Sequence, residues 1–256
     1  MHFFDEINKK EYILSCSYED NNLKLWDLNN LENLLCLINI NSQGGLRSAS
    51  ILKDNGQNYI ITSNCQYLDE ISDPLKVYDF KGNKVKEIED SNETTFFIDS
   101  FYDNKSFINY IITGNIDCAK SYIFNQNKLY HKYFNTKKEN HSVKIDNSEE
   151  IIKLLVASGD GYIRIWDFHL RILIKAINCD VFLDCLCLWK NEYAFVGCDN
   201  HLIKLVNLKS GNIVKELTGH KNYLMDIIKI THPKYGECLI SQGYHDDQIK
   251  LWVITN

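Results

Sequence analysis

The chain has 256 residues, of which 45% are hydrophobic, and a net charge of −6 from 28 basic and 34 acidic residues. This length allows one substantial core or a ring of small ones. The basic residues are dispersed, no apolar run reaches the length of a membrane span, and the first residues lack the organisation of a signal peptide. We therefore expect neither nucleic acid nor a membrane as partner, and a cytoplasmic location, with a nuclear or ciliary complex as the alternative.

Six stretches of the chain share one organisation, in which an apolar run, a polar turn and a second alternating run follow one another. Alternation with period 2 and an abundance of β-branched and aromatic residues predict a pair of β-strands in each stretch. The stretches occupy residues 12–28, 59–80, 110–125, 152–168, 192–208 and 237–254.

The residues that close the second runs recur at intervals of 52, 46, 42, 40 and 46 residues. Two further strand-like runs lie between consecutive stretches, for example residues 171–177 and 181–189. Four strands in a period near 40–45 residues are typical of the blades of a β-propeller. The closing residues are Trp26, Tyr78, Phe124, Trp166, Val206 and Trp252.

Three motifs, NLKLWDL (22–28), YIRIWDF (162–168) and TGH followed by IKLW (218–252), resemble the WD-repeat family of β-propellers. The resemblance extends over nearly the whole chain. It implies an all-β fold with about six recognisable four-stranded blades, formed by residues 1–256 as one WD-repeat domain. The middle repeats depart from the family pattern, because Tyr78, Phe124 and Val206 stand where the family prefers tryptophan.

The resemblance also implies structural roles for several polar residues. In the family, an aspartate six residues before the tryptophan lies in a turn and bonds a histidine from the loop before the first strand. The last repeat has the full set, in which His220 would bond Asp246 while Ser241 and Trp252 complete the network. The corresponding residues of the other motifs are Asp20 with Trp26 and Asp160 with Trp166.

The sequence offers little support for a cofactor or a metal ion. His220 has no second histidine or cysteine at ligand spacing, and the nine cysteines are irregularly placed, which favours buried, reduced thiols. Gly159 and Gly161 flank Asp160, but no Lys-Ser/Thr follows them, so we interpret them as glycines of a hairpin turn rather than of a phosphate loop. We expect no cofactor and no metal.

The two ends of the repeat array do not match. Aligned on their tryptophans, the first repeat lacks its Gly-His loop and half of its first strand, and the last repeat stops after its third strand. We therefore expect incomplete first and last blades and a chain that is part of a longer or truncated protein. The open sheet edge predicts strand donation from a missing segment or from a partner.

No catalytic constellation is visible, so we expect a non-enzymatic scaffold that presents a rigid face to protein or peptide partners. The alternative is a regulatory or targeting propeller of a larger protein, such as a kinase or ubiquitin-ligase subunit. A propeller enzyme would need inward histidines or carboxylates from several blades. The candidate contact residues, each of which is otherwise an ordinary surface residue, are Arg47, Tyr18, Tyr162 and Tyr244.

Overall fold

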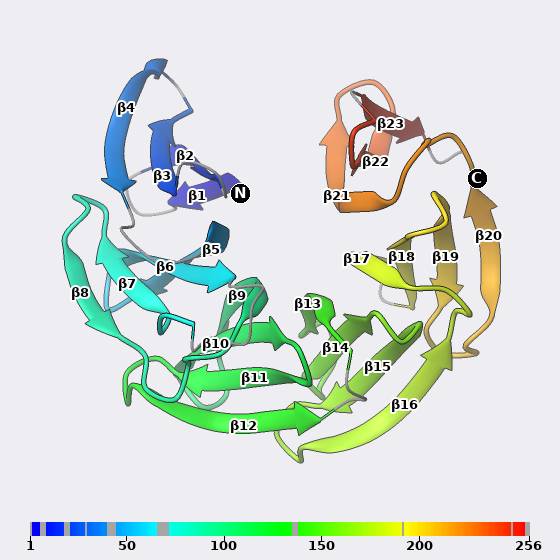
Figure 1. Cartoon of the computed structure of the whole chain (residues 1–256), viewed down its shortest axis with the longest axis horizontal. Helices are drawn as coiled ribbons and strands as arrows, with labels where there is room; N and C mark the ends of the chain where they lie inside the picture. Colours follow the sequence, from blue (N-terminus) through cyan, green and yellow to red (C-terminus); the bar gives the residue numbers. More distant parts are fainter. Residues whose placement is uncertain are drawn as a thin grey trace. The chain divides into compact units, whose positions relative to one another are not determined.

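The protein is described by a computed structural model that covers residues 2–5, 9–17, 21–28, 30–39, 45–65, 72–134, 138–190, 192–246 and 248–253. Within these ranges every regular element is a β-strand, and none of the described residues forms a helix long and apolar enough to cross a membrane. The chain divides into two compact units, Met1–Phe134 (unit 1) and Asn135–Asn256 (unit 2). Each unit contains three antiparallel sheets, which we name A to F in chain order (Figure 1).

Unit 1 contains three four-stranded sheets, in each of which consecutive strands are neighbours. Sheet A consists of β1 (His2–Asp5), β2 (Lys10–Cys16), β3 (Asn22–Asp27) and β4 (Asn30–Asn39). Sheet B consists of β5 (Gly45–Asp54), β6 (Gln57–Cys65), β7 (Lys76–Asp79) and β8 (Lys84–Glu87). Sheet C consists of β9 (Thr95–Asp103), β10 (Ile108–Asn115), β11 (Cys118–Ile123) and β12 (Lys128–Phe134).

Unit 2 contains two four-stranded sheets and one sheet of three strands. Sheet D consists of β13 (Asn140–Asp146), β14 (Lys153–Ser158), β15 (Tyr162–Asp167) and β16 (Ile172–Asn178). Sheet E consists of β17 (Leu183–Trp189), β18 (Tyr193–Cys198), β19 (Ile203–Asn207) and β20 (Ile213–Leu217). Sheet F consists of β21 (Leu224–His232), β22 (Gly236–Gly243) and β23 (Ile249–Val253).

The predicted all-β organisation in repeated four-stranded sheets is confirmed. The sequence predicts half of a first strand in the first blade, and sheet A accordingly begins with a strand of only four residues, β1, which pairs with β2 and completes a four-stranded sheet. Sheet F has three strands among the residues that the structure describes, as predicted for the last repeat.

The predicted position of Phe124 in the third repeat is wrong by two residues. In sheet D the tryptophan follows a bulge between the third and fourth strands, and the amide of Phe168, two residues later, donates to the carbonyl of Ile152 at 2.9 Å. In sheet C the bulge precedes Tyr122, and it is Phe124 whose amide donates to the carbonyl of Asn109, at 3.0 Å. Tyr122 therefore occupies the tryptophan position.

A basic residue supports the corrected alignment. Two positions before the tryptophan site, every sheet carries a lysine or an arginine, and sheet C follows this rule only when Tyr122 is the aligned residue. The cause of the misalignment is chemical, because both Tyr122 and Phe124 are aromatic and the sequence offers no bulge signal to separate them. The basic residues are Lys24, Lys76, Lys120, Arg164, Lys204 and Lys250.

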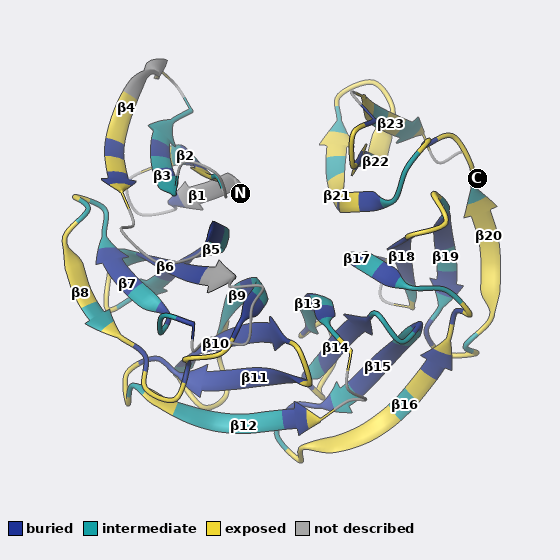
Figure 2. Cartoon of the chain, in the orientation of Figure 1, coloured by how far each residue is buried: buried dark blue, intermediate teal, exposed yellow. Residues whose placement is uncertain are grey.

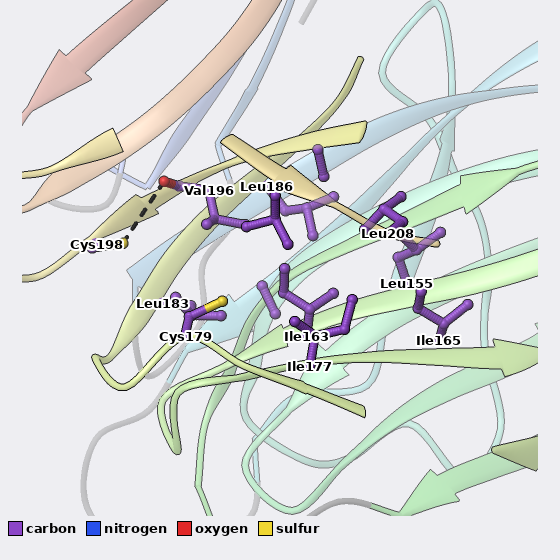
Figure 3. Close-up of a cluster of buried hydrophobic side chains, with 13 residues drawn as sticks. Leu155, Ile163, Ile165, Ile177, Cys179, Leu183, Leu186, Val196, Cys198 and Leu208 are labelled. Atoms are coloured by element: carbon purple, nitrogen blue, oxygen red, sulfur yellow. Dashed lines mark hydrogen bonds between the residues drawn. The ribbon is translucent and has the colours of Figure 1, made fainter. Parts of the chain in front are cut away.

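The apolar cores lie between consecutive sheets of each unit. In unit 2, Ile163 of sheet D and Leu186 of sheet E belong to one cluster of buried side chains (Figure 3). Phe195 of sheet E and Leu224 of sheet F belong to the next cluster. Middle strands such as β14 and β15 are largely buried, whereas the outer strands β16 and β20 are largely exposed (Figure 2). The near-continuous apolar runs of the middle strands follow from this double covering.

Candidate interaction site

A chain of hydrogen bonds links four side chains of unit 2. Trp252 Nε1 donates to Ser241 Oγ at 2.7 Å, and Ser241 Oγ lies 2.6 Å from His220 Nε2. His220 Nδ1 contacts Asp246 Oδ2. A neutral imidazole with its proton on Nδ1 satisfies these contacts, because Nδ1 then donates to the carboxylate and Nε2 accepts from the serine hydroxyl.

The side chains of His220 and Asp246 are almost fully buried, at 1% and 0% exposure. The hydrogen bond from His220 holds the pKa of the Asp246 carboxyl below its ordinary value of 3.8. A buried carboxylate is tolerated when it is hydrogen-bonded in this way. The arrangement therefore fixes the loop before β21 against the turn between β22 and β23. The His220 ring and the Asp246 carboxylate hold these two segments together.

The other sheets vary this arrangement. In sheet A, Trp26 Nε1 donates to Ser15 Oγ at 3.1 Å, whereas Asp20 lies outside the described residues. In sheet D, Asp160 accepts from Arg164 Nη1 at 3.0 Å and from Nη2 at 2.5 Å, and Trp166 lies opposite Leu154 in the β14–β15 register. The charge of the turn aspartate of sheet D is thus balanced by the arginine of β15, the strand that follows the turn.

The first strands of sheets B to F share an irregularity that the sequence did not predict. Each contains a β-bulge near its start, so one residue per strand has no partner in the adjacent second strand. A bulge changes the direction of a side chain relative to the regular alternation of a strand. These five residues, which we call the bulge residues, are Arg47 and Phe96 in unit 1 and His141, Asp184 and Met225 in unit 2.

The residue before each bulge anchors the strand. All five of these preceding residues are buried, with at most 2% of their surface exposed, whereas every bulge residue is at least partly exposed. The backbone is thereby fixed at a point where one side chain is partly exposed. The anchoring residues are Leu46, Thr95, Asn140, Leu183 and Leu224.

Two bulge residues of unit 2 lie close together. His141 Nδ1 is 3.9 Å from Asp184 Oδ1, and the ring of His141 meets that of Phe182 edge-on with centroids 5.1 Å apart. Phe182 packs over Gly159, where an added Cβ would lie 2.4 Å from its ring. The Gly-Asp-Gly turn of sheet D therefore gives room to an aromatic side chain from the loop before β17.

We expect Gly159→Ala to destabilise unit 2 by about 1–3 kcal/mol, because the new methyl group overlaps the Phe182 ring. Urea unfolding followed by circular dichroism measures this change. Phe182→Leu in the same background should restore part of the loss, and Phe182→Leu alone is the control. If Gly159→Ala is as stable as the natural chain, the packing of Phe182 on this turn is wrong.

The candidate contact residues fall in different places. Arg47 is a partly exposed bulge residue, and Tyr18 lies outside the described residues. Tyr162 begins β15, where the Arg164 guanidinium lies 5.1 Å from its ring centre. Tyr244 is 40% exposed and stacks on Tyr223 with ring centres 4.7 Å apart. Tyr244 thus lies in the turn between the second and third strands of sheet F, whereas Tyr162 is the first residue after the corresponding turn of sheet D.

Several cysteines of the described residues are buried and are poor nucleophiles. Burial raises the pKa of the Cys118 and Cys179 thiols to about 11 and that of Cys198 to about 12, so these thiols are protonated at neutral pH. Among the same residues, no group of three or more His, Cys, Asp or Glu side chains is placed to hold a metal ion.

Comparison with solved structures identifies the fold. The chain superposes on the crystal structure of the WD40 β-propeller domain of Doa1 with a TM-score of 0.72 and 17% identity, over 95% of this chain and 75% of that one. The fold is that of a WD40 β-propeller domain, and the resemblance drawn from the sequence motifs is confirmed at this level.

Sequence comparison is more limited. The U3 small nucleolar RNA-associated protein 21 homolog of Schizosaccharomyces pombe is 32% identical over 84 residues, which are 32% of this chain and 9% of that protein. The chain thus matches a small part of this relative's length. No protein-family model matches the chain.

Sequence reasoning found one of the five bulge residues, Arg47, and missed the others. The distance from bulge residue to tryptophan position differs between sheets, because the connections between the first, second and third strands vary in length. The sequence signal by which a bulge residue could be found is local. It is one polar or large residue directly after a buried residue near the start of the strand. That signal is too weak to use before the strands are aligned.

Proposed function

We propose that this chain is a non-catalytic protein–protein interaction scaffold that contacts protein or peptide partners through its bulge residues. The observation that carries the proposal is the repeated bulge, which places one partly exposed side chain on a rigidly anchored strand in five sheets. Recognition groups are effective when the scaffold that holds them is rigid.

The bulge residues differ in chemistry while their backbone setting is the same. A cation, an aromatic ring, an imidazole, a carboxylate and a thioether occur at the five positions, as Arg47, Phe96, His141, Asp184 and Met225. A purely structural requirement would favour similar side chains at equivalent positions. Variation on a constant backbone supports a role in selecting a partner.

A non-enzymatic role is supported by the partners of the buried polar groups. Asp246 is bound by His220, and Asp160 is bound by Arg164, so these carboxylates hold turns together. Proteins that share this fold have unrelated functions, so this proposal rests on the site and not on the fold.

We further propose that residues 1–256 act as one WD-repeat domain. The alternative, a regulatory or targeting part of a larger protein, remains a second proposal.

The cellular setting is proposed from the matched relative. Its name places that protein with small nucleolar RNA, which favours membership of a nuclear complex over the cytoplasmic location expected from the sequence. The dispersed basic residues still favour a protein partner within such a complex rather than direct contact with nucleic acid.

Co-purification with a tagged chain, quantified by mass spectrometry, tests the proposal. Met225→Glu, a change at a 39% exposed bulge residue, should reduce recovery of specific partners at least tenfold, which corresponds to about 1.4 kcal/mol. Asp184→Asn should act in the same direction. The matched control is Glu192→Lys, an exposed residue beyond the other end of β17. Equal recovery with natural and variant chains of equal melting temperature would refute the proposal.

A further inference from the structure

The turn that joins β9 to β10 in unit 1 ends in a phenylalanine with a left-handed backbone. Phe107 has a φ of 58°, and its amide donates to the carbonyl of Asp103 at 2.8 Å. The carboxylate of Asp103 accepts from the amide of Lys105 at 2.9 Å, so local hydrogen bonds close the turn. A residue with a Cβ is disfavoured at such a φ, and a bulky side chain is rare there. The sequence therefore places a costly residue at this position.

Two turns of unit 2 are closed in the same way and show which residue this backbone favours. The amide of Arg171 donates to the carbonyl of Asp167 at 2.9 Å, and the amide of Gly211 donates to the carbonyl of Asn207 at 2.7 Å. The φ values of Arg171 and Gly211 are 62° and 88°. Glycine adopts this conformation without a steric penalty. The turn of sheet E therefore has the least costly residue where the turn of sheet C has phenylalanine.

Packing within the chain does not account for Phe107 either. Phe107 is 75% exposed, the highest value among the exposed large apolar residues that the structure describes. An exposed apolar residue alone needs no explanation. One that also occupies an unfavourable backbone conformation does, because residues held in such conformations are concentrated at functional sites. The turn thus holds an aromatic ring in solvent at a cost to the fold.

The surface around Phe107 carries little charge. The turn between β11 and β12 lies at the same end of sheet C, since Phe124, which begins it, donates its amide to the carbonyl of Asn109 in β10 at 3.0 Å. Lys105 is the one exposed charged residue in these two turns. Their other exposed polar side chains are those of Asn104, Ser106, Asn125 and Gln126. An aromatic residue in surroundings depleted of charge is typical of the core of a protein–protein interface.

We propose that Phe107 is the anchor of a contact surface for a second partner protein, which receives the ring in an apolar pocket. Groups around that pocket bind the amide side chains of the two turns. Aromatic anchors carry a large share of the binding energy at interfaces, and a turn that holds the ring in place lowers the entropic cost of association. Phe107 follows the end of β9, whereas the bulge residue Phe96 lies near its start, so this surface is separate from the bulge residues.

A lipid surface is a poorer match for these turns than a protein. Binding to anionic lipid depends on clusters of lysine or arginine close to the membrane. The two turns contain one such residue, Lys105, and the net charge of the chain is −6.

The first test is the stability of the 256-residue chain with Phe107→Gly. Glycine relieves the cost of the left-handed conformation, which offsets the greater freedom of the unfolded chain, so the melting temperature should not fall. Arg171→Gly, at the equivalent position of a turn in sheet D, is the matched control and should behave in the same way. A fall of several degrees with Phe107→Gly alone would show that the ring packs within the chain and would overturn the proposal.

The second test measures partner binding with the same two variants. A protein that co-purifies with tagged Arg171→Gly, and is lost at least tenfold with Phe107→Gly, is expressed and purified for titration. Its dissociation constant should be at least tenfold higher for Phe107→Gly than for the natural chain. Equal recovery of all proteins with both variants, or equal dissociation constants, would overturn the proposal.

Two further measurements separate other occupants of this surface. One is flotation of the chain with vesicles of four parts phosphatidylcholine to one part phosphatidylserine, and the other is light scattering of the chain alone. We expect neither to depend on Phe107. Flotation that Phe107→Gly abolishes would assign the ring to a lipid surface, and a dimer that Phe107→Gly dissociates would assign it to a second copy of the chain. Either result would overturn the proposal.

Discussion

Ile203→Asp is expected to unfold unit 2, whereas Ile249→Asp is expected to change the free energy of unfolding by less than about 0.5 kcal/mol. The two isoleucines occupy equivalent positions in sheets E and F, but Ile203 is fully buried and Ile249 is 72% exposed. A carboxylate at position 203 has no partner beneath sheet F, and an unpaired buried charge costs more than about 4 kcal/mol. That loss is a large part of the roughly 5–15 kcal/mol of a typical domain.

Hydrogen exchange of β17 to β23 is the appropriate measurement for this pair, because it reports on unit 2 without averaging over unit 1. Ile203→Val should lower the free energy of unfolding by only about 0.5–1.5 kcal/mol. This variant is the control that separates the effect of the charge from that of any substitution at position 203. If Ile203→Asp and Ile249→Asp have similar effects, the assignment of equivalent faces in sheets E and F is wrong.

His220→Ala is expected to destabilise unit 2 by about 1–3 kcal/mol, because the buried partners of the imidazole lose their hydrogen bonds. The side chain of His220 is 1% exposed and contacts both Asp246 and Ser241. Thermal unfolding followed by tryptophan fluorescence, to which Trp252 of the same hydrogen-bonded chain contributes, measures the effect. The control is His245→Ala, an exposed histidine of the neighbouring turn.

The same variant should alter the dependence of stability on pH. The pKa of Asp246 is lowered in the folded state by the His220 hydrogen bond, so the ionised carboxylate stabilises the fold above its ordinary pKa of 3.8. This contribution is lost as the pH falls through the lower pKa of the folded state. We expect a smaller loss on acidification in His220→Ala than in the natural chain. An equal loss in both would contradict the role given to the pair.

The repeated strand pattern was predictable because each sheet must bury apolar side chains at a fixed period. Trp26, Trp166 and Trp252 fixed the register of three sheets, since an aspartate lies six residues before each of them. Sheet C was misaligned because Tyr122, in β11, and Phe124, directly after the end of β11, are both aromatic. The bulge that precedes Tyr122 identifies it as the aligned residue, and this bulge is a backbone feature with no residue type of its own.

The candidate interaction site was less accessible to sequence reasoning. Arg47 was noticed as a charged residue at the start of a strand, while His141 and Asp184 lay in stretches with no distinguishing motif. Their proximity depends on the bulges of two neighbouring sheets, and such contacts between distant residues are set by packing. The short first strand β1 was predictable, because alignment of the tryptophans leaves room for half of a first strand at the start of the chain.

Site-specific photo-crosslinking tests the central claim most directly. A benzoylphenylalanine placed at position 225, 184 or 47 of the tagged chain reports on partners that lie within a few ångströms of the bulge residues in cells. Positions 214 and 192, both exposed and away from the bulges, are the controls. We predict protein adducts from the three bulge positions and none from the controls. Adducts from the controls alone, or from no position, would contradict the proposed interaction site.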